Sequence, residues 1–238
     1  MKESTFKVDC SYCPIKHRAV CARCEPDELE ILNEIKYYKP VAAGETVALS
    51  GERVDYVASV VSGVASLSKS LEDGRTQMVG LVLPSDFIGR PGRETIAHDV
   101  TAVTDLTLCC FHRKPFDKIL EELPHVRERL LEMMFDEMDA ARDWMLLLGR
   151  KTAREKIASF LVLMVNRSTL PKELFIAPVR VDLPISRDAI ANFLGLTIET
   201  VSRQLTALRK DGIISLEGNR EVIIPDFQAL KDEAGLSD

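Results

Sequence analysis

One long amphipathic stretch, residues 124–148, constrains the fold of this chain more than any other feature of its sequence. Apolar residues recur there in alternating steps of three and four, the spacing that keeps one stripe of a helix facing a partner helix. These positions are Leu131, Met134, Met138, Ala141, Met145 and Leu148. The residues between them are mostly charged, so we expect the rest of the helix to face solvent. The pattern is typical either of a surface helix packed on its own core or, as we favour, of a helix that pairs with a second copy of the chain.

The charge differs on the two sides of this stretch. Residues 1–149 carry 18 Lys and Arg against 25 Asp and Glu, a net charge of −7, whereas residues 150–238 carry 13 against 12, a net charge of +1. Phosphates attract positive charge, so the second half is the better candidate for approaching nucleic acid. The chain has 238 residues, of which 46% are hydrophobic, and this is enough to build a core in each of two domains.

No segment of the sequence resembles a membrane span or a secretion signal. No run approaches the roughly 20 apolar residues that cross a bilayer, and the first ten residues, MKESTFKVDC, lack the apolar core of a signal peptide. We therefore expect a cytoplasmic protein without a membrane partner. In a reducing compartment, clustered cysteines indicate a metal site or a redox group rather than disulfides.

Four of the six cysteines lie within fifteen residues, as the CxxC pairs Cys10/Cys13 and Cys21/Cys24. A tight turn brings two thiolates at this spacing to the same side, where they can bind one ion or one cluster. Four thiolates could close a tetrahedral zinc site or hold an iron–sulfur cluster, and the residues alone leave both open. A redox enzyme is a third possibility, but no GxGxxG, no P-loop and no Ser/His/Asp set occurs, so we expect no enzyme.

Before residue 40 a short helix is expected, with Leu29, Leu32 and Ile35 on one face. From 41 to 116 the pattern changes to short β-rich runs, separated by turns at Gly44, Gly51, Gly63 and Gly74. Strands at this spacing predict a small antiparallel sandwich or barrel. In the last run, LTLCCF, side-chain alternation predicts that Cys109 points outwards and that Cys110 is buried and inert.

The final third of the chain predicts two short helices joined by a sharp turn. Ser186 and Thr197 are expected to cap these helices, and Gly195 permits the turn between them. The second helix has an apolar inner face and a polar outer face, the latter with Ile198, Glu199, Ser202, Arg203 and Thr206. With a strand pair turning at residues 217–219, this pattern favours a winged helix-turn-helix over an ordinary helical hairpin. A carboxylate can accept from cytosine, and a guanidinium can bind guanine by two hydrogen bonds.

Together these segments resemble the CRP/FNR superfamily of bacterial transcription regulators, and within it the FNR group, over essentially the whole chain. The resemblance is carried by CSYCPIKHRAVC, LPSDFIGRPG, LTLCCF, WMLLLGRKTAREKIASFL and FLGLTIETVSRQL. It implies an α+β fold: a β-roll sensor domain of the cyclic-nucleotide-binding type at residues 1–123, a dimerisation helix at 124–149, and a winged helix-turn-helix DNA-binding domain at 150–238.

The resemblance also implies a 4Fe-4S cluster held by Cys10, Cys13, Cys21 and Cys109. Seven residues separate Cys13 from Cys21, where the best-known FNR pattern has five, and Cys24 is an additional thiol that could replace Cys21 as the third ligand. A zinc site would instead use Cys24 and leave Cys109 unused. The family's recognition motif, Glu-x-x-Ser-Arg, matches Glu199, Ser202 and Arg203, which implies two-fold operators with TTGAT-like half-sites.

Relatives that sense cyclic nucleotides carry a Gly-Glu pair and a later Arg-Ser pair. Here Arg90 follows Gly89, and residues 97–100 read AHDV, so no cyclic nucleotide is expected. An aspartate near a bound phosphate would repel it. The implied function is an oxygen-responsive regulator that binds double-stranded DNA as a homodimer under low oxygen and acts on RNA polymerase. Its target genes, and whether it activates or represses each of them, do not follow from the sequence.

Overall fold

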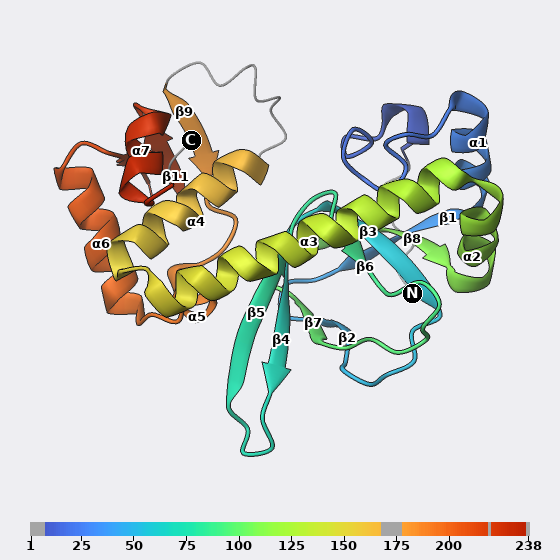
Figure 1. Cartoon of the computed structure of the whole chain (residues 1–238), viewed down its shortest axis with the longest axis horizontal. Coiled ribbons are helices and arrows are strands. Elements are labelled where there is room, and N and C mark those ends of the chain that lie inside the picture. The colour runs from blue at the N-terminus through green and yellow to red at the C-terminus, as the bar shows by residue number, and fades with distance from the viewer. Residues whose placement is uncertain (1–7, 168–177, 219, 237–238) are drawn as a thin grey trace. The chain divides into compact units, whose positions relative to one another are not determined.

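The computed structural model describes residues 8–167, 178–218 and 220–236. The chain divides into two compact units, residues 1–140 and 141–238, and the boundary falls inside one long helix (Figure 1). The sequence predicted divisions at 123/124 and 149/150 instead, which would set this helix apart as a segment of its own. Those finer boundaries stay a prediction.

The first unit is a β-roll whose strands are preceded and followed in the chain by helices, and every strand pair in it is antiparallel. Its elements, in chain order, are the 3-10 helix η1 (Cys10–Tyr12), α1 (Pro26–Ile35), β1 (Lys36–Val41), β2 (Thr46–Ala48), β3 (Tyr56–Ser62), β4 (Ala65–Ser70), β5 (Thr76–Val82), β6 (Phe87–Ile88), β7 (Asp99–Ala102), β8 (Leu106–His112), α2 (Arg113–Glu122) and the first part of α3 (Pro124–Arg150).

Two sheets form the roll, one in the order β1-β8-β3-β6 and the other in the order β2-β7-β4-β5. Strands β4 and β5 continue beyond the rest of their sheet as a long hairpin (Figure 1). The four predicted turn glycines all adopt positive φ angles of 83° to 87°, a conformation that few other residues tolerate. The predicted antiparallel β fold is therefore confirmed.

Strand β8 has the predicted alternation of side chains and is buried on both faces. Leu106, Leu108 and Cys110 pack in the core between the two sheets, as expected from side-chain alternation. Cys109 and Phe111 point to the other face but are not exposed, because the amino-terminal loop and the helices cover that face with a second core. Cys109 therefore points away from the core between the sheets, as predicted, although it is only 8% exposed because this second core covers it.

Strand β1 begins earlier than the sequence predicted. The expected helix ends at Ile35, and the next six residues, KYYKPV, pair with β8 as an edge strand. Two tyrosines favour extended backbone. Pro40 is tolerated because an edge strand has one side without ladder hydrogen bonds.

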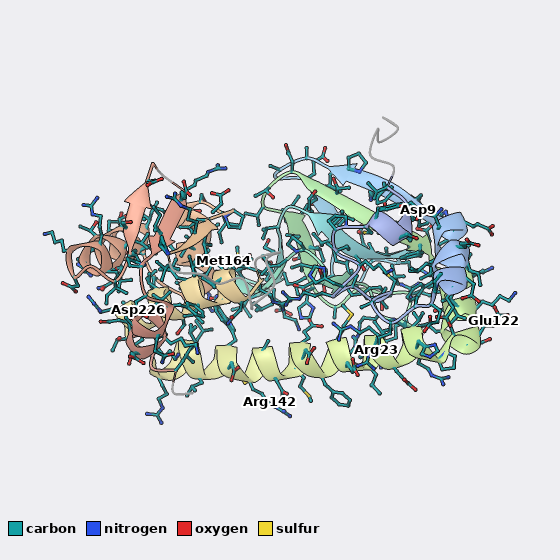
Figure 2. All side chains as sticks on the ribbon, turned by 90° about the horizontal axis from the view of Figure 1, so that it is seen from above. Asp9, Arg23, Glu122, Arg142, Met164 and Asp226 are labelled. Carbon is teal, nitrogen blue, oxygen red and sulfur yellow. The ribbon has the colours of Figure 1, made fainter. Side chains whose placement is uncertain are left out.

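The second unit contains the rest of α3 and a compact helical domain. Its further elements are α4 (Ala153–Arg167), β9 (Val179–Asp182), α5 (Arg187–Leu194), α6 (Ile198–Lys210), β10 (Ser215–Glu217), β11 (Glu221–Ile224) and α7 (Phe227–Glu233). Figure 2 shows Met164 of α4 directed into this domain, where it is buried. Helix α3 continues past Gly149, which the sequence placed at a break, and ends one residue later.

The predicted pair of helices has the predicted caps. Ser186 Oγ accepts a hydrogen bond from the Ala189 amide at 3.1 Å, and Thr197 Oγ1 accepts one from the Thr200 amide at 3.2 Å. Gly195 ends α5 at φ 60°. The strand pair β10–β11 forms the predicted wing, and β9 pairs with β11 as a third strand. Asn219 of the predicted wing turn lies outside the described residues.

Within the described ranges, no helix combines the length and the apolar composition that a membrane span requires.

Candidate cysteine pocket and nucleic-acid interface

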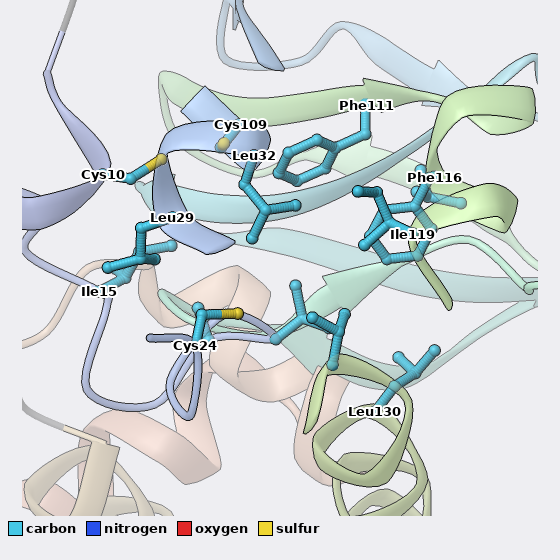
Figure 3. Packing of buried hydrophobic residues seen from close by; sticks show 14 of the residues in the cluster. Cys10, Ile15, Cys24, Leu29, Leu32, Cys109, Phe111, Phe116, Ile119 and Leu130 are labelled. Atoms are coloured by element: carbon cyan, nitrogen blue, oxygen red, sulfur yellow. The ribbon is translucent and has the colours of Figure 1, made fainter. Parts of the chain in front are cut away.

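The four cysteines predicted as ligands line one small pocket between the amino-terminal loop and the roll. Cys10, Cys13 and Cys21 come from the loop, and Cys109 comes from β8. Most of the remaining lining is apolar and includes Ile15, Ala19, Val20, Leu32 and Phe111. The close view shows Cys10 and Cys109 near Leu32, with Cys24 well apart from them (Figure 3). Three thiols from the amino-terminal loop and one from β8 thus share one apolar site, although Cys10 and Cys109 are 99 residues apart in sequence.

The other two cysteines do not line this pocket. Cys24 is buried in the same apolar cluster, apart from Cys10 and Cys109 (Figure 3). Cys110 lies on the opposite face of β8 in the core between the sheets, as predicted. The structure therefore brings Cys21, rather than Cys24, together with the other three predicted ligands.

One row of side chains across the sheet forms the floor of the pocket. Tyr38 on β1 and Ser59 on β3 are the register partners of Cys109 on β8. Residues paired across strands project from the same face, and all three line the pocket. The Tyr38 hydroxyl donates to the Val8 carbonyl at 3.0 Å, whereas Ser59 Oγ is buried without a hydrogen-bond partner in the described chain.

Burial makes these thiols hard to ionise. Desolvation, with smaller repulsion from Cys10 and Cys13, raises the pKa of Cys21 to about 12. Burial likewise raises the pKa of Cys109 well above its usual range. It also raises the pKa of Cys10, although the Lys36 ammonium, whose Nζ donates to Cys10 Sγ at 3.3 Å, opposes that shift. Metal cations counter such shifts, since a thiol that coordinates a metal releases its proton to solvent and binds as the thiolate.

Four thiols in one pocket are the donor set of either a metal–sulfur cluster or a single zinc ion. Zinc would need four sulfurs within about 2.3 Å of a single centre, and among the described residues no three Cys, His, Asp or Glu side chains are placed to hold one ion. The cavity between the thiols is about 20 Å³, room for roughly one water, so a cluster would have to widen it. The hydrogen bonds within the loop are those of short turns, such as Lys16 N–H to the Cys13 carbonyl and Ala22 N–H to the Ala19 carbonyl.

The cysteine loop is attached directly to the start of α3. Arg129 Nη2 donates to the Arg18 carbonyl at 2.8 Å. Arg23 forms an ion pair with Glu132 at 2.7 Å, and Glu132 also pairs with Arg129 at 3.2 Å. These contacts therefore connect the cysteine loop to the first turns of α3.

The predicted apolar stripe of α3 faces solvent rather than the chain's own core. Leu131, Met134 and Met138 are between 42% and 55% exposed, and Met145 is 71% exposed. Ala141 is also exposed, and Leu148 is half-buried. The residues with which α3 packs on the core lie on another face of the helix and include Val126, Leu130 and Leu147. Side chains near Arg142 project away from the helix ribbon (Figure 2). Phe135 and Leu146, which the sequence analysis did not include, extend the exposed stripe.

Helix α6 presents the predicted polar face. Glu199 and Arg203 are exposed and Ser202 is half-buried, whereas Val201, Leu205 and Leu208 are buried beneath them. Arg187, at the first turn of α5, donates from Nη1 to Ser202 Oγ at 3.2 Å. The Glu199 carboxylate and the Arg203 guanidinium are therefore exposed to solvent, and the hydrogen bond from Arg187 fixes the Ser202 side chain.

Three contributors were missed at the sequence level: Ser59, Arg187 and the Arg129–Glu132 pair. The signal for Ser59 was a lone hydroxyl within the apolar run YVASVV. The other contacts join residues whose proximity only the folded chain establishes, and no local pattern marks them.

Known proteins are similar to this chain over both the β-roll and the helix-turn-helix domain. Residues 38–122 match the family model of a cyclic nucleotide-binding domain, and residues 155–233 match that of a Crp-like helix-turn-helix domain. The chain is 60% identical to the transcriptional activator protein FnrL of Cereibacter sphaeroides, over 95% of this chain and 92% of that protein. It is 40% identical to the nitrogen fixation regulation protein FixK of Bradyrhizobium diazoefficiens, over 91% and 92% of the two chains. The structure of FixK2 from Bradyrhizobium japonicum is similar with a TM-score of 0.75 at 32% identity, covering 86% of this chain and 100% of that one.

Proposed function

Because the chain belongs to the CRP/FNR family of transcription regulators, whose members are not enzymes, we propose that it is a transcription activator controlled by oxygen through a 4Fe-4S cluster. The observation that carries this proposal is the convergence of Cys10, Cys13, Cys21 and Cys109 on one pocket. The curated relatives FnrL and FixK are a transcriptional activator and a nitrogen fixation regulator, and we assign the activator role here by that similarity.

The chemistry of the pocket supports a cluster. Iron–sulfur clusters are held by Cys thiolates, and an apolar shell limits the access of water to them. A bound cluster would be held through its irons by the four thiolates. Its reaction with oxygen would break these bonds and release the thiolates. The separate position of Cys24 argues against a zinc site built from the two CxxC pairs, since such a site needs Cys24 and leaves Cys109 unused.

The contacts between the loop and α3 support control of dimerisation. Thiolates fixed in one pocket hold the loop against the roll, and Arg129 and Glu132 then fix the first turns of α3. The exposed stripe begins there, at Leu131. A fixed helix loses less conformational freedom when it pairs with a second copy, so the homodimer is favoured when the thiolates are held. Loss of the cluster frees the loop and weakens that preference.

We propose that the homodimer binds double-stranded DNA at palindromic sites with TTGAT-like half-sites and acts on RNA polymerase from there. In a helix-turn-helix dimer, the two recognition helices enter the major groove about one helical turn apart. Glu199, Ser202 and Arg203 lie on the exposed face of α6 that would meet the bases.

The same roll is not proposed to bind a cyclic nucleotide, although its fold is of that type. Arg90 stands in place of the expected glutamate. The Asp99 carboxylate accepts a hydrogen bond from the Ser50 amide at 2.8 Å and would place negative charge beside a phosphate.

Anaerobic purification of the full chain tests this function. We expect about four irons and four sulfides per chain from the proposed cluster type, a brown colour that bleaches in air, and operator binding that declines as the colour is lost. Colourless protein with one zinc and with operator binding insensitive to air would establish the alternative, a zinc-dependent or cofactor-independent regulator.

A further inference from the structure

The cysteine pocket contains one buried hydroxyl that the ligand assignment leaves unexplained. Ser59 is only 3% exposed, and its Oγ has no hydrogen-bond partner in the described chain. Burying a hydroxyl without a partner destabilises a protein, so such groups in native structures call for an explanation such as an absent ligand, ion or water. The neighbouring positions from Tyr56 to Val61 are all buried and otherwise largely apolar, so packing alone does not require a serine there.

The register of the sheet places this hydroxyl beside the strand ligand. Ser59 pairs directly with Cys109, and paired side chains project from the same face. Ser59 lines the same pocket as Cys10, Cys13 and Cys21. The other hydroxyl in the lining belongs to Tyr38 and donates to the Val8 carbonyl. Among the lining residues, Ser59 is therefore the one whose O–H has no acceptor.

We propose that Ser59 donates a hydrogen bond to a sulfur of the iron–sulfur group in this pocket, and that this bond makes the group harder to oxidise. The inference rests on the proposed function and concerns a positioning residue rather than a ligand. A serine O–H is a donor that rotates to suit its acceptor. Hydrogen bonds to cluster sulfurs help to set the reduction potential, because a donor stabilises the reduced form, which carries more negative charge.

A bound water is the alternative partner. The cavity has room for roughly one water, which could accept from Ser59 without any cluster. In that case the hydroxyl would solvate the pocket and would not affect how fast oxygen destroys the cluster.

The test compares Ser59→Ala and Ser59→Thr with Ser62→Ala, whose serine is exposed at the end of the same strand. The full chain is purified without oxygen, its iron content is measured, and the loss of absorbance near 400 nm is followed at a fixed oxygen concentration. We expect Ser59→Ala to keep its iron but to bleach about two- to tenfold faster than the wild type, the factor that one hydrogen bond supplies. Ser59→Thr keeps the hydroxyl and should bleach more slowly than Ser59→Ala, and Ser62→Ala should match the wild type.

The metal-free proteins supply an independent readout. Ser59→Ala removes an unpaired hydroxyl, so its metal-free form should melt at or above the wild-type temperature. A clear loss of stability in that form, or a bleaching rate equal to that of the wild type, would overturn the inference and leave the cluster intact. Wild-type protein that carries no iron when purified without oxygen would overturn the proposed function and this inference together.

Discussion

Two adjacent cysteines on β8 show how one strand assigns different chemistry to neighbouring residues. Cys109 faces the loop thiols, whereas Cys110 faces the core between the sheets. Both are buried, and burial raises the pKa of both, that of Cys110 to about 12. Exposure and acidity therefore do not distinguish them. They differ in their neighbours: Cys109 shares a pocket with three further thiols, whereas Cys110 does not.

The same reasoning separates Cys21 from Cys24. Cys21 lines the pocket and Cys24 does not, so we expect Cys21→Ala to lose most of its iron in anaerobic preparations. Cys24→Ala should keep an iron content close to that of the wild type. Iron and sulfide analysis of the two variants checks this, and the reverse pattern would assign the third ligand to Cys24.

The hydrogen bond from Arg187 to Ser202 leads to a second expectation at this scale. Arginine only donates, so Ser202 Oγ accepts from it and can direct its own O–H towards an acceptor on a base. We expect Arg187→Ala to weaken operator binding by about two- to tenfold, and to weaken it no further in a protein that already carries Ser202→Ala.

Salt dependence distinguishes this role from a contact between Arg187 and a phosphate. Loss of a phosphate contact lowers the salt slope by about one and weakens all DNA sequences equally. Loss of a positioning contact leaves the slope unchanged and changes only the preference at the base that Ser202 meets. Additive losses in the double variant, with a reduced slope, would contradict the positioning role.

At the scale of elements, α3 has two apolar faces with separate tasks. One face packs on the core through Val126 and Leu130, and the other, from Leu131 onwards, is left exposed. A contiguous exposed apolar stripe of this kind marks an interaction surface. We infer that a second copy of α3 covers it.

A charge placed on this stripe should prevent pairing. We expect Met138→Glu to weaken dimerisation of anaerobic protein by about 100-fold or more, since two apolar side chains lose their burial and two carboxylates would enter the interface. Ala140→Glu adds the same charge at an exposed position off the stripe and serves as the control. Analytical ultracentrifugation measures both variants, and equal association constants would rule out this face as the dimer interface.

In the carboxy-terminal domain, one ion pair joins α4 to α7. Glu233 accepts from Arg154 Nε at 2.5 Å and from Nη2 at 3.0 Å, and this pairing holds the pKa of the Glu233 carboxyl below its usual range. A lowered carboxyl pKa stabilises the fold above the ordinary value near 4.5, and this stabilisation disappears as the pH falls through the lowered value.

We therefore expect Glu233→Gln to reduce the free energy of unfolding at pH 7 by about 1 kcal/mol, a value discounted for partial exposure. At pH 3 the difference from the wild type should be clearly smaller, because the Glu233 carboxyl of the unfolded chain, with its ordinary pKa near 4.5, is then protonated. Urea unfolding at the two pH values measures this. A difference that is equal at both would show that the charge of Glu233 does not contribute.

Local patterns predicted the long helix, the β-rich region and the helix-turn-helix, but not strand β9 or the contacts between elements. Periodicity identified α3, and Ser186, Gly195 and Thr197 marked the turn between α5 and α6. Alternation correctly assigned Cys109 and Cys110 to opposite faces of β8. It could not show that the loop around Cys21 covers the Cys109 face, because that depends on a contact between segments almost ninety residues apart. The sheet pairing of Ser59 with Cys109 and the hydrogen bond between Arg187 and Ser202 could not be predicted for the same reason.

At the scale of the whole molecule, the contacts suggest a sequence of events from pocket to helix to DNA. In the proposed function, bound thiolates would hold the loop, and the contacts of Arg129 and Glu132 join the loop to the start of α3. Helix α3 continues without a break to Arg150 in the second unit, which contains the recognition helix. Dimerisation and DNA binding are thus expected to respond together to the state of the pocket.

The most direct measurement of this coupling compares Cys109→Ala with Cys110→Ala in protein purified without oxygen. Both substitutions remove one buried thiol from the same strand, but only the first removes it from the pocket. We expect Cys109→Ala to lose its iron, its dimer and its operator binding together, while Cys110→Ala retains all three. Full operator binding by an iron-free Cys109→Ala protein, or equal losses in both variants, would contradict control of DNA binding by the cysteine pocket.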